Sequence, residues 1–211
     1  MQISKGELSI EALEAVAAEV HRETNGLRAQ KCIFIGGDPF TLFNDFMNNN
    51  TFKRLENDGV RLKYAPLSEY MWFIWRDSLS RKKNLRDIAA TRALEQMADN
   101  MGRIYRIFSF EGSFEDDIRK LVPIANEHSR LYSGANGRYR MTKALSKTSN
   151  FAGRIMVCSM YENTDTILSI LSQDCIKDSG LPMLNLSFDG NENELDKSKI
   201  DSFMYVTRGR G

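Results

Sequence analysis

The stretch Lys31-Cys32-Ile33-Phe34-Ile35, followed at once by Gly36-Gly37-Asp38-Pro39, decides the fold. A short apolar run that ends in a glycine-rich turn predicts a buried strand delivered into a loop. A helical pattern through Phe43 and Leu55 then leads to a second apolar run, from Val60 to Tyr64. Strand, helix and strand in this order form a βαβ unit, so the two strands should pair in parallel.

The same organisation returns near the C-terminus. The segments 154–158 and 181–188 predict two more strands, separated by a helix over about 164–175. A final amphipathic helix places Ile200, Phe203 and Met204 inward. We therefore expect an α/β fold, with an open, mostly parallel Rossmann/flavodoxin-like sheet that has helices on both faces.

Between Leu67 and Lys147 the sequence predicts helices but no strand, with interruptions near Asn84, Gly112 and 134–137. We expect a Rossmann-like domain over 31–211 that carries a helical insertion at about 67–147. Residues 1–30 form a separate N-terminal helical segment. Its apolar face must pack on something and consists of Ile10, Leu13, Val16, Ala17 and Val20.

The composition argues against several classes of partner and indicates the cellular compartment. Basic and acidic residues number 29 and 28, so no overall field attracts nucleic acid or an anionic membrane. The longest apolar run, 71–75, is too short to span a bilayer, and the N-terminus lacks a signal-peptide pattern. The three cysteines have no C-x-x-C spacing, which argues against a disulfide framework and against a self-contained zinc site. We expect a cytoplasmic protein.

Parallel sheets bind ligands outside the carboxyl ends of their strands, so the loops at 36–39, 65–69, 158–163 and 187–191 should converge. Gly36 and Gly37 either bring backbone N–H groups to a phosphate or form a plain tight turn. Asp38, before Pro39, is expected to cap a helix. The carboxylates on this rim act either as a general acid or base or as solvated charges and caps; they are Glu69, Glu162 and Asp189.

Cys158 is the candidate for chemistry, because it lies at a strand end just before a predicted helix. A thiolate there acts as a nucleophile or a metal ligand, and the alternative is a small buried apolar residue. Cys32 lies inside the first predicted strand and Cys175 continues the apolar face of a predicted helix, so both are expected to be core residues. The two histidines, His21 and His128, lie on helices and away from the strand-end loops, so no catalytic triad is expected.

Two features of the helical insertion have open interpretations. The run around Trp72 and Trp75 is apolar on all sides of a helix, which predicts deep burial or contact with another chain. Arg138, Arg140 and Lys143 form a small basic cluster. That cluster either holds an anion such as a CoA phosphate or belongs to an ordinary solvated face.

Three segments carry a family resemblance. The stretch 31–50, Pro66-Leu67-Ser68-Glu69-Tyr70 and the closing run 181–191, which ends in Asp189-Gly190-Asn191, resemble the C-terminal part of 2-hydroxyacyl-CoA dehydratase subunits. They resemble even more the dehydratase-related region of large CoA-enzyme activase proteins. The residues 154–163 are similar to the family's strand-cysteine turn, and the resemblance covers almost the whole chain.

The resemblance implies a Rossmann-like domain in a protein that binds a [4Fe-4S] cluster and transfers low-potential electrons to an acyl-CoA. Cys158 matches the one cluster ligand that the family takes from this domain, and the other ligands come from an N-terminal domain. The family commonly has proline two residues after that cysteine, whereas this chain has Met160.

We therefore expect a fragment or stand-alone copy that is silent alone and contributes Cys158 to a cluster completed by a cluster-bearing domain or subunit of the same family. One alternative is a non-catalytic interaction module that docks through Tyr70 to Trp75. The other is a CoA-binding or nucleotide-binding domain without a cluster, whose ligand contacts Gly36, Gly37, Asp38, Glu69 and Asp189.

Overall fold

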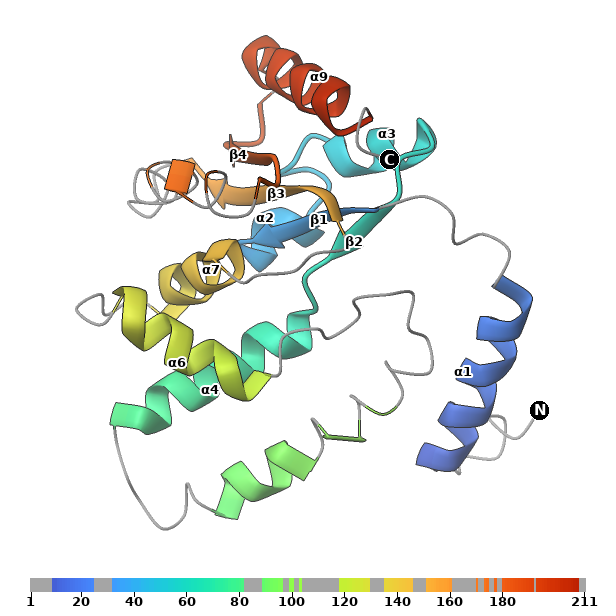
Figure 1. The fold of residues 1–211 in the computed structure, drawn as a ribbon, viewed down its shortest axis with the longest axis vertical. Coiled ribbons are helices and arrows are strands. Elements are labelled where there is room, and N and C mark those ends of the chain that lie inside the picture. Colours follow the sequence, from blue (N-terminus) through green and yellow to red (C-terminus); the bar gives the residue numbers. More distant parts are fainter. Residues whose placement is uncertain are drawn as a thin grey trace.

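A four-stranded sheet in the order β2-β1-β3-β4 organises the molecule (Figure 1). The computed structural model describes residues 9–24, 32–81, 89–96, 99–100, 103, 118–129, 135–145, 151–160, 170, 173–174, 177, 180–191 and 193–208. The strands are β1 (Cys32–Gly37), β2 (Leu62–Tyr64), β3 (Phe151–Ser159) and β4 (Met183–Phe188). Every neighbouring pair is parallel, which confirms the predicted sheet.

The labelled helices are α1 (Ile10–Thr24), α2 (Pro39–Phe43), α3 (Thr51–Asn57), α4 (Leu67–Arg81), α6 (Ile118–Ser129), α7 (Ala135–Leu145) and α9 (Glu194–Arg208). Residues 89–96 are also helical. Of the helix predicted at 164–175, residues 170, 173 and 174 are described and are helical, and the other residues of that range lie outside the described part of the chain. The proposed division into 1–30 and 31–211 stays a prediction.

The two faces of the sheet carry different cores, because alternate residues of a strand point to opposite faces. Ile33 and Ile35 belong to the core shared with α3 and α9, whereas Phe34 belongs to the core shared with α7. In β3, Ile155 and Val157 face the first core and Met156 faces the second. The expected covering of both faces is confirmed, and Figure 1 shows α9 and α7 on opposite sides of the sheet.

The helix α9 approaches β3 closely at Gly153. A Cβ at this position would lie 2.6 Å from Cζ of Phe203 and 2.8 Å from Cγ2 of Thr207. Ile200 and Phe203 are buried and Met204 is partly buried, as their spacing predicts. A glycine in β3 thus allows the last helix to lie directly on the sheet.

The described part of the insertion is helical, as expected, and α4, α6 and α7 pack against one another through Phe73, Leu121, Ala125 and Tyr139. Trp72 is only 7% exposed. Trp72 and Phe73 are therefore buried within the chain itself, whereas Met71 in the same run is 60% exposed. A partner is not needed to cover Trp72 or Phe73.

Two boundaries differ from the prediction. The single helix expected through Phe43 and Leu55 is broken into α2 and α3 by a turn over 44–50, in which Asn49 and Asn50 have φ values of 53° and 52°. Asparagine tolerates this left-handed backbone better than most residues, and a helix cannot continue through it. Conversely, Gly137 does not interrupt the helical structure, because it lies inside α7, where it is buried.

The helix α1 buries less of its apolar face than the spacing predicts. Ala17 is fully buried, but Val16 and Val20 are 40% and 38% exposed. Arg103 forms an ion pair with Glu14 of this helix at 2.9 Å. Part of the expected packing face is therefore open to solvent.

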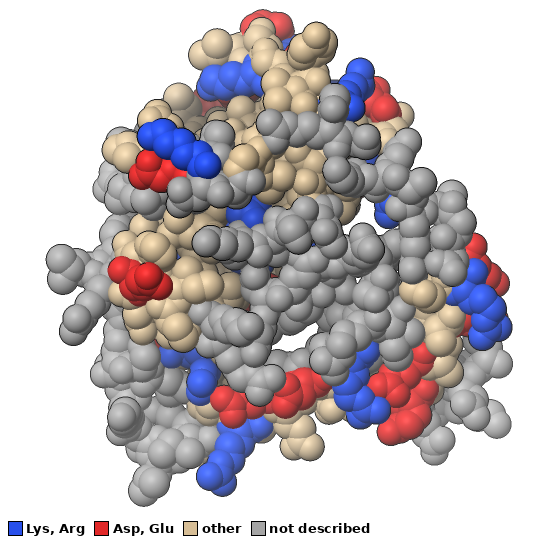
Figure 2. Space-filling model, viewed as in Figure 1, with Lys and Arg blue, Asp and Glu red and all other residues tan. Residues whose placement is uncertain are grey.

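Charge is mixed on the surface. On the face shown in Figure 2, basic and acidic side chains of the described residues lie next to one another rather than gathering by sign. None of the helices that the structure describes is both long enough and apolar enough to cross a bilayer.

Candidate functional site

The sheet order places the candidate site at the carboxyl ends of β1 and β3. The chain passes from β1 to β2 on one side and reaches β3 on the other, so these two neighbours form the topological switch point. In open parallel sheets, the crevice above such a point is where ligands bind.

Gly36 and Gly37 are the last residues of β1 and not part of a loop, which corrects the predicted strand end. Gly37 has φ of 134°, and a Cβ there would lie 2.0 Å from the carbonyl oxygen of Val157. The N–H of Asp38 donates to that same oxygen at 2.9 Å. The glycines therefore let β1 and β3 meet closely at the switch point, and this N–H is already used within the sheet.

Asp38 caps α2, as its position before Pro39 predicts. Its Oδ2 accepts hydrogen bonds from the backbone N–H and from the hydroxyl of Thr41, both at 2.8 Å. Its Oδ1 accepts a longer bond, 3.4 Å, from Nδ2 of Asn136 in α7. This carboxylate therefore joins the first turn of α2 to the insertion at the edge of the sheet.

Glu69 lies in the first turn of α4 but is only 1% exposed. The hydroxyl of Tyr139 donates to its Oε1 at 2.7 Å, and Nζ of Lys143 lies 3.1 Å from the same oxygen. A carboxylate held this way by a phenol and an ammonium group joins α4 to α7. The structure therefore places Glu69 inside the helical layer, and not among solvated rim charges.

The basic cluster of the insertion is also buried. Arg138, Arg140 and Lys143 are 2%, 0% and 5% exposed. Arg138 pairs with Asp77 at 3.0 Å and donates to Asn126 at 2.5 Å. The interpretation as a solvated face is wrong, because all three side chains are buried, and Arg138 and Lys143 pair with carboxylates of α4.

Asp189 follows β4 and is exposed. Its carboxylate accepts hydrogen bonds from the backbone N–H of Asn191 at 2.8 Å and from the Asn191 side chain at 3.1 Å. These bonds favour the charged form, so the pKa of Asp189 lies below its usual value. Asp189 shapes the turn after β4. Glu162, the third carboxylate predicted on this rim, lies outside the described residues.

Cys158 is the penultimate residue of β3 and is 1% exposed. Its Sγ lies 3.1 Å from the hydroxyl of Ser187, its register partner in β4, and 3.6 Å from the carbonyl oxygen of Leu186. The sulfur thus lies beside the Ser187 side chain on one face of the sheet, under cover of other atoms. Cys175 lies outside the described residues.

As placed, Cys158 does not fit a ligand of an external iron–sulfur cluster, because a sulfur this deeply buried cannot touch one unless the strand end moves. Cys32 lies opposite Phe151, and Phe151 is seven residues before Cys158 in β3. Seven residues of a strand span about 23 Å, so Cys32 and Cys158 are about that far apart. These two thiols cannot share one cluster. Among the described residues, no group of three or more His, Cys, Asp and Glu side chains is arranged to hold a metal ion.

Large apolar side chains are exposed where three neighbouring strands end. Phe40 follows β1 and is 64% exposed, and Met160 follows β3 and is 43% exposed. Leu67 and Met71, one turn apart on α4 after β2, are 50% and 60% exposed. Neighbouring strands are about 4.8 Å apart, so these elements start within about 10 Å of one another. Exposed apolar residues that follow neighbouring strand ends make this edge a candidate binding surface.

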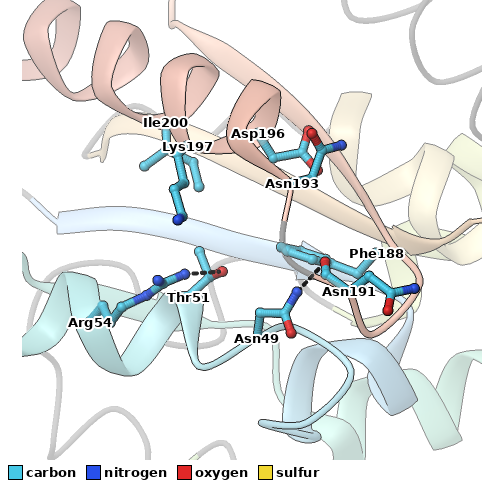
Figure 3. Close-up of a pocket in the computed structure, with 9 residues that line it drawn as sticks. All are labelled: Asn49, Thr51, Arg54, Phe188, Asn191, Asn193, Asp196, Lys197 and Ile200. Carbon is cyan, nitrogen blue, oxygen red and sulfur yellow. Dashed lines mark hydrogen bonds between the residues drawn. The ribbon is translucent and has the colours of Figure 1, made fainter.

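A hollow lies beside the end of β4, between α3 and α9 (Figure 3). Its lining residues are Asn49, Thr51, Arg54, Phe188, Asn191, Asn193, Asp196, Lys197 and Ile200. The predicted rim loop 187–191 contributes two of these residues, whereas the sequence pattern did not predict the other seven as site residues. The run Asn48-Asn49-Asn50 was the available signal, since clustered asparagines favour a break with a left-handed backbone.

Comparisons of the chain with protein-family models, with curated proteins and with solved structures find no match in any of the three. The family resemblance therefore stays a prediction.

Proposed function

We propose that this chain is a dehydratase-like, Rossmann-type domain that binds a CoA thioester at the carboxyl edge of its sheet. The observation that carries the proposal is that four large apolar side chains, Phe40, Leu67, Met71 and Met160, are exposed just after the ends of β1, β2 and β3. The sequence resemblance supplies the ligand class. The fold supplies the location, since ligands of open parallel sheets bind at this crevice.

The chemistry of the edge suits a thioester with an apolar acyl group. Burying an exposed apolar side chain contributes about 25 cal/mol per Å² of apolar area, and four such side chains offer a sizeable surface to an acyl chain. The close approach of β1 and β3 at Gly37 fixes the backbone beneath that surface. The domain would then bind and orient an acyl-CoA without performing chemistry alone.

Calorimetry tests the proposal with butyryl-CoA and with CoA as the two probes. We expect saturable heat with both and tighter binding of butyryl-CoA, because only its acyl group reaches the apolar surface. The variants Phe40→Ser and Met71→Ser should each weaken butyryl-CoA binding about three- to tenfold. Tyr205→Ser is the matched control, because Tyr205 is 84% exposed on α9. Absence of heat at millimolar butyryl-CoA, or equal weakening by Tyr205→Ser, would contradict the proposal.

The second candidate is that a cluster-bearing partner of the same family meets the chain at this edge and takes Cys158 as a ligand. The position of Cys158 supports this candidate, because only Ser159 separates it from the exposed Met160. The burial of Sγ requires that the partner opens the end of β3. Cys158→Ala in the full assembly should then lower the iron content, and an unchanged iron content together with unchanged activity would remove this candidate.

A further inference from the structure

Two basic side chains from different helices face the hollow between α3 and α9 (Figure 3). Arg54 belongs to α3, and its guanidinium donates to the Thr51 hydroxyl at 3.4 Å. Lys197 belongs to α9, and in the close-up its ammonium group is directed toward α3. Two like charges on opposite walls repel each other, and an anion between them would turn that repulsion into attraction.

The nearby carboxylates do not compensate these two charges strongly. Asp196 is 8% exposed, and its Oδ1 is bound by Lys199 at 3.0 Å. Glu194 pairs with Lys197 at 2.7 Å, but the side chain of Glu194 is 85% exposed. Such a water-exposed pair contributes little. The exposed carboxylate of Glu194 can therefore give way to an anion that enters the hollow.

Neutral donors complete the lining. The side chains of Thr51, Asn49, Asn191 and Asn193 supply hydroxyl and amide groups, and Nδ2 of Asn49 donates to the backbone oxygen of Asn191. That bond joins the turn before α3 to the turn after β4 and fixes two walls of the hollow. Phe188 and Ile200 close its base.

The size of the hollow limits what it accepts. Its enclosed space is about 20 Å³, room for one water-sized group, and the rest is open to solvent. Pockets for whole small molecules are typically about 300 to 1,000 Å³. The hollow therefore takes up only the oxygens of one charged group, and the rest of a larger ligand would stay in solvent.

We infer that the hollow between α3 and α9 is a phosphate site, in which Arg54 and Lys197 bind the oxygens of one phosphate group. Arginine and lysine pair with phosphate through charge-assisted hydrogen bonds, which are the strong ones. The group is either inorganic phosphate or a phosphate of CoA. Only the second source rests on the proposed function.

NMR titration of the full ¹⁵N-labelled chain with inorganic phosphate, at pH 7 and constant ionic strength, tests the site directly. We expect amide shifts at Asn49, Asn191 and Lys197 that saturate with a Kd on the order of 1 mM. Arg54→Gln and Lys197→Gln should each raise this Kd about tenfold. Lys53→Gln and Arg208→Gln change the net charge equally outside the hollow and should leave the Kd within about twofold.

The outcomes separate the phosphate site from the proposed function. Shifts that do not saturate, or equal weakening by the control variants, overturn the site. Parallel titrations with CoA distinguish the two sources. Phosphate binding without CoA binding keeps the site and removes the thioester proposal. CoA binding that Arg54→Gln and Lys197→Gln leave unchanged, with no phosphate binding, removes the site and keeps the thioester proposal.

Discussion

At the scale of single residues, burial decides what the candidate side chains can do. Sequence position placed Cys158 and Glu69 at the carboxyl rim, and the backbone does carry them there. Their side chains nevertheless turn inward, to Ser187 in one case and to Lys143 in the other. Which way a side chain faces at a strand end depends on its distant partners, and a single sequence does not reveal those partners.

The thiol of Cys158 should be protected in the native chain. We expect a maleimide reagent to modify Cys158 at least tenfold more slowly in buffer than in urea, because its Sγ becomes accessible only when β3 and β4 separate. Mass spectrometry of the digested protein measures this. Cys32, which is partly exposed, is the internal control. Equal rates for Cys158 in buffer and in urea would show that the strand end is open.

The pKa of Asp189 should lie below the usual range for an aspartate. The backbone and side chain of Asn191 donate to the charged carboxylate, so folding favours deprotonation. The stabilising contribution is therefore complete above the unfolded pKa and is lost as the pH falls through the lower folded pKa. Carboxyl carbon NMR measures the titration, and Asn191→Ala should raise the pKa. A normal pKa in the unaltered chain would contradict these hydrogen bonds.

At the scale of elements, the strands were predictable because their pattern is local. Four short apolar runs, each bounded by turn residues, gave four parallel strands with boundaries shifted by at most a few residues. The break between α2 and α3 was not predicted, because Phe43, Phe46 and Leu55 mimic helical spacing across it. The hollow beside β4 was missed for a related reason, since it combines residues from two turns and two helices.

Gly37 should tolerate no side chain. Gly37→Ala places a Cβ 2.0 Å from a backbone oxygen of β3, and backbone cannot move aside as a flexible side chain does. We expect a loss of about 3 kcal/mol or more in the free energy of unfolding, measured in urea. Gly59→Ala is the matched control. It also has a positive φ, 81°, but no heavy atom lies within 4 Å of its Cβ, so only about 1 to 2 kcal/mol should be lost. Equal losses would contradict the close approach of β1 and β3.

At the scale of the whole molecule, a buried ion pair joins helices that are far apart in the chain. Glu69 of α4 and Lys143 of α7 are both nearly inaccessible to solvent. Their connection matters for the sheet as well, because α7 also packs on β1. Charge pattern alone did not predict this pairing, since Glu69 and Lys143 each look like surface residues when only sequence neighbours are considered.

Breaking that pair should destabilise the molecule. Glu69→Gln leaves Lys143 charged and buried, at an expected cost of about 3 to 5 kcal/mol in the free energy of unfolding. Lys53→Gln removes an exposed pair with Asp45 and should cost less than about 1 kcal/mol. The double variant Glu69→Gln with Lys143→Met should recover part of the loss. Urea denaturation compares the variants, and a Glu69→Gln chain as stable as the Lys53→Gln chain would contradict the account.

The order β2-β1-β3-β4 also has a consequence for synthesis on the ribosome. Cys32 pairs opposite Phe151, about 120 residues later in the chain. The strand β1 leaves the ribosome long before its central partner, and until β3 arrives one of its edges presents unpaired backbone groups. Such an edge recruits other chains during translation. The nascent polypeptide should therefore depend on a chaperone that shields β1, whereas the finished sheet should not.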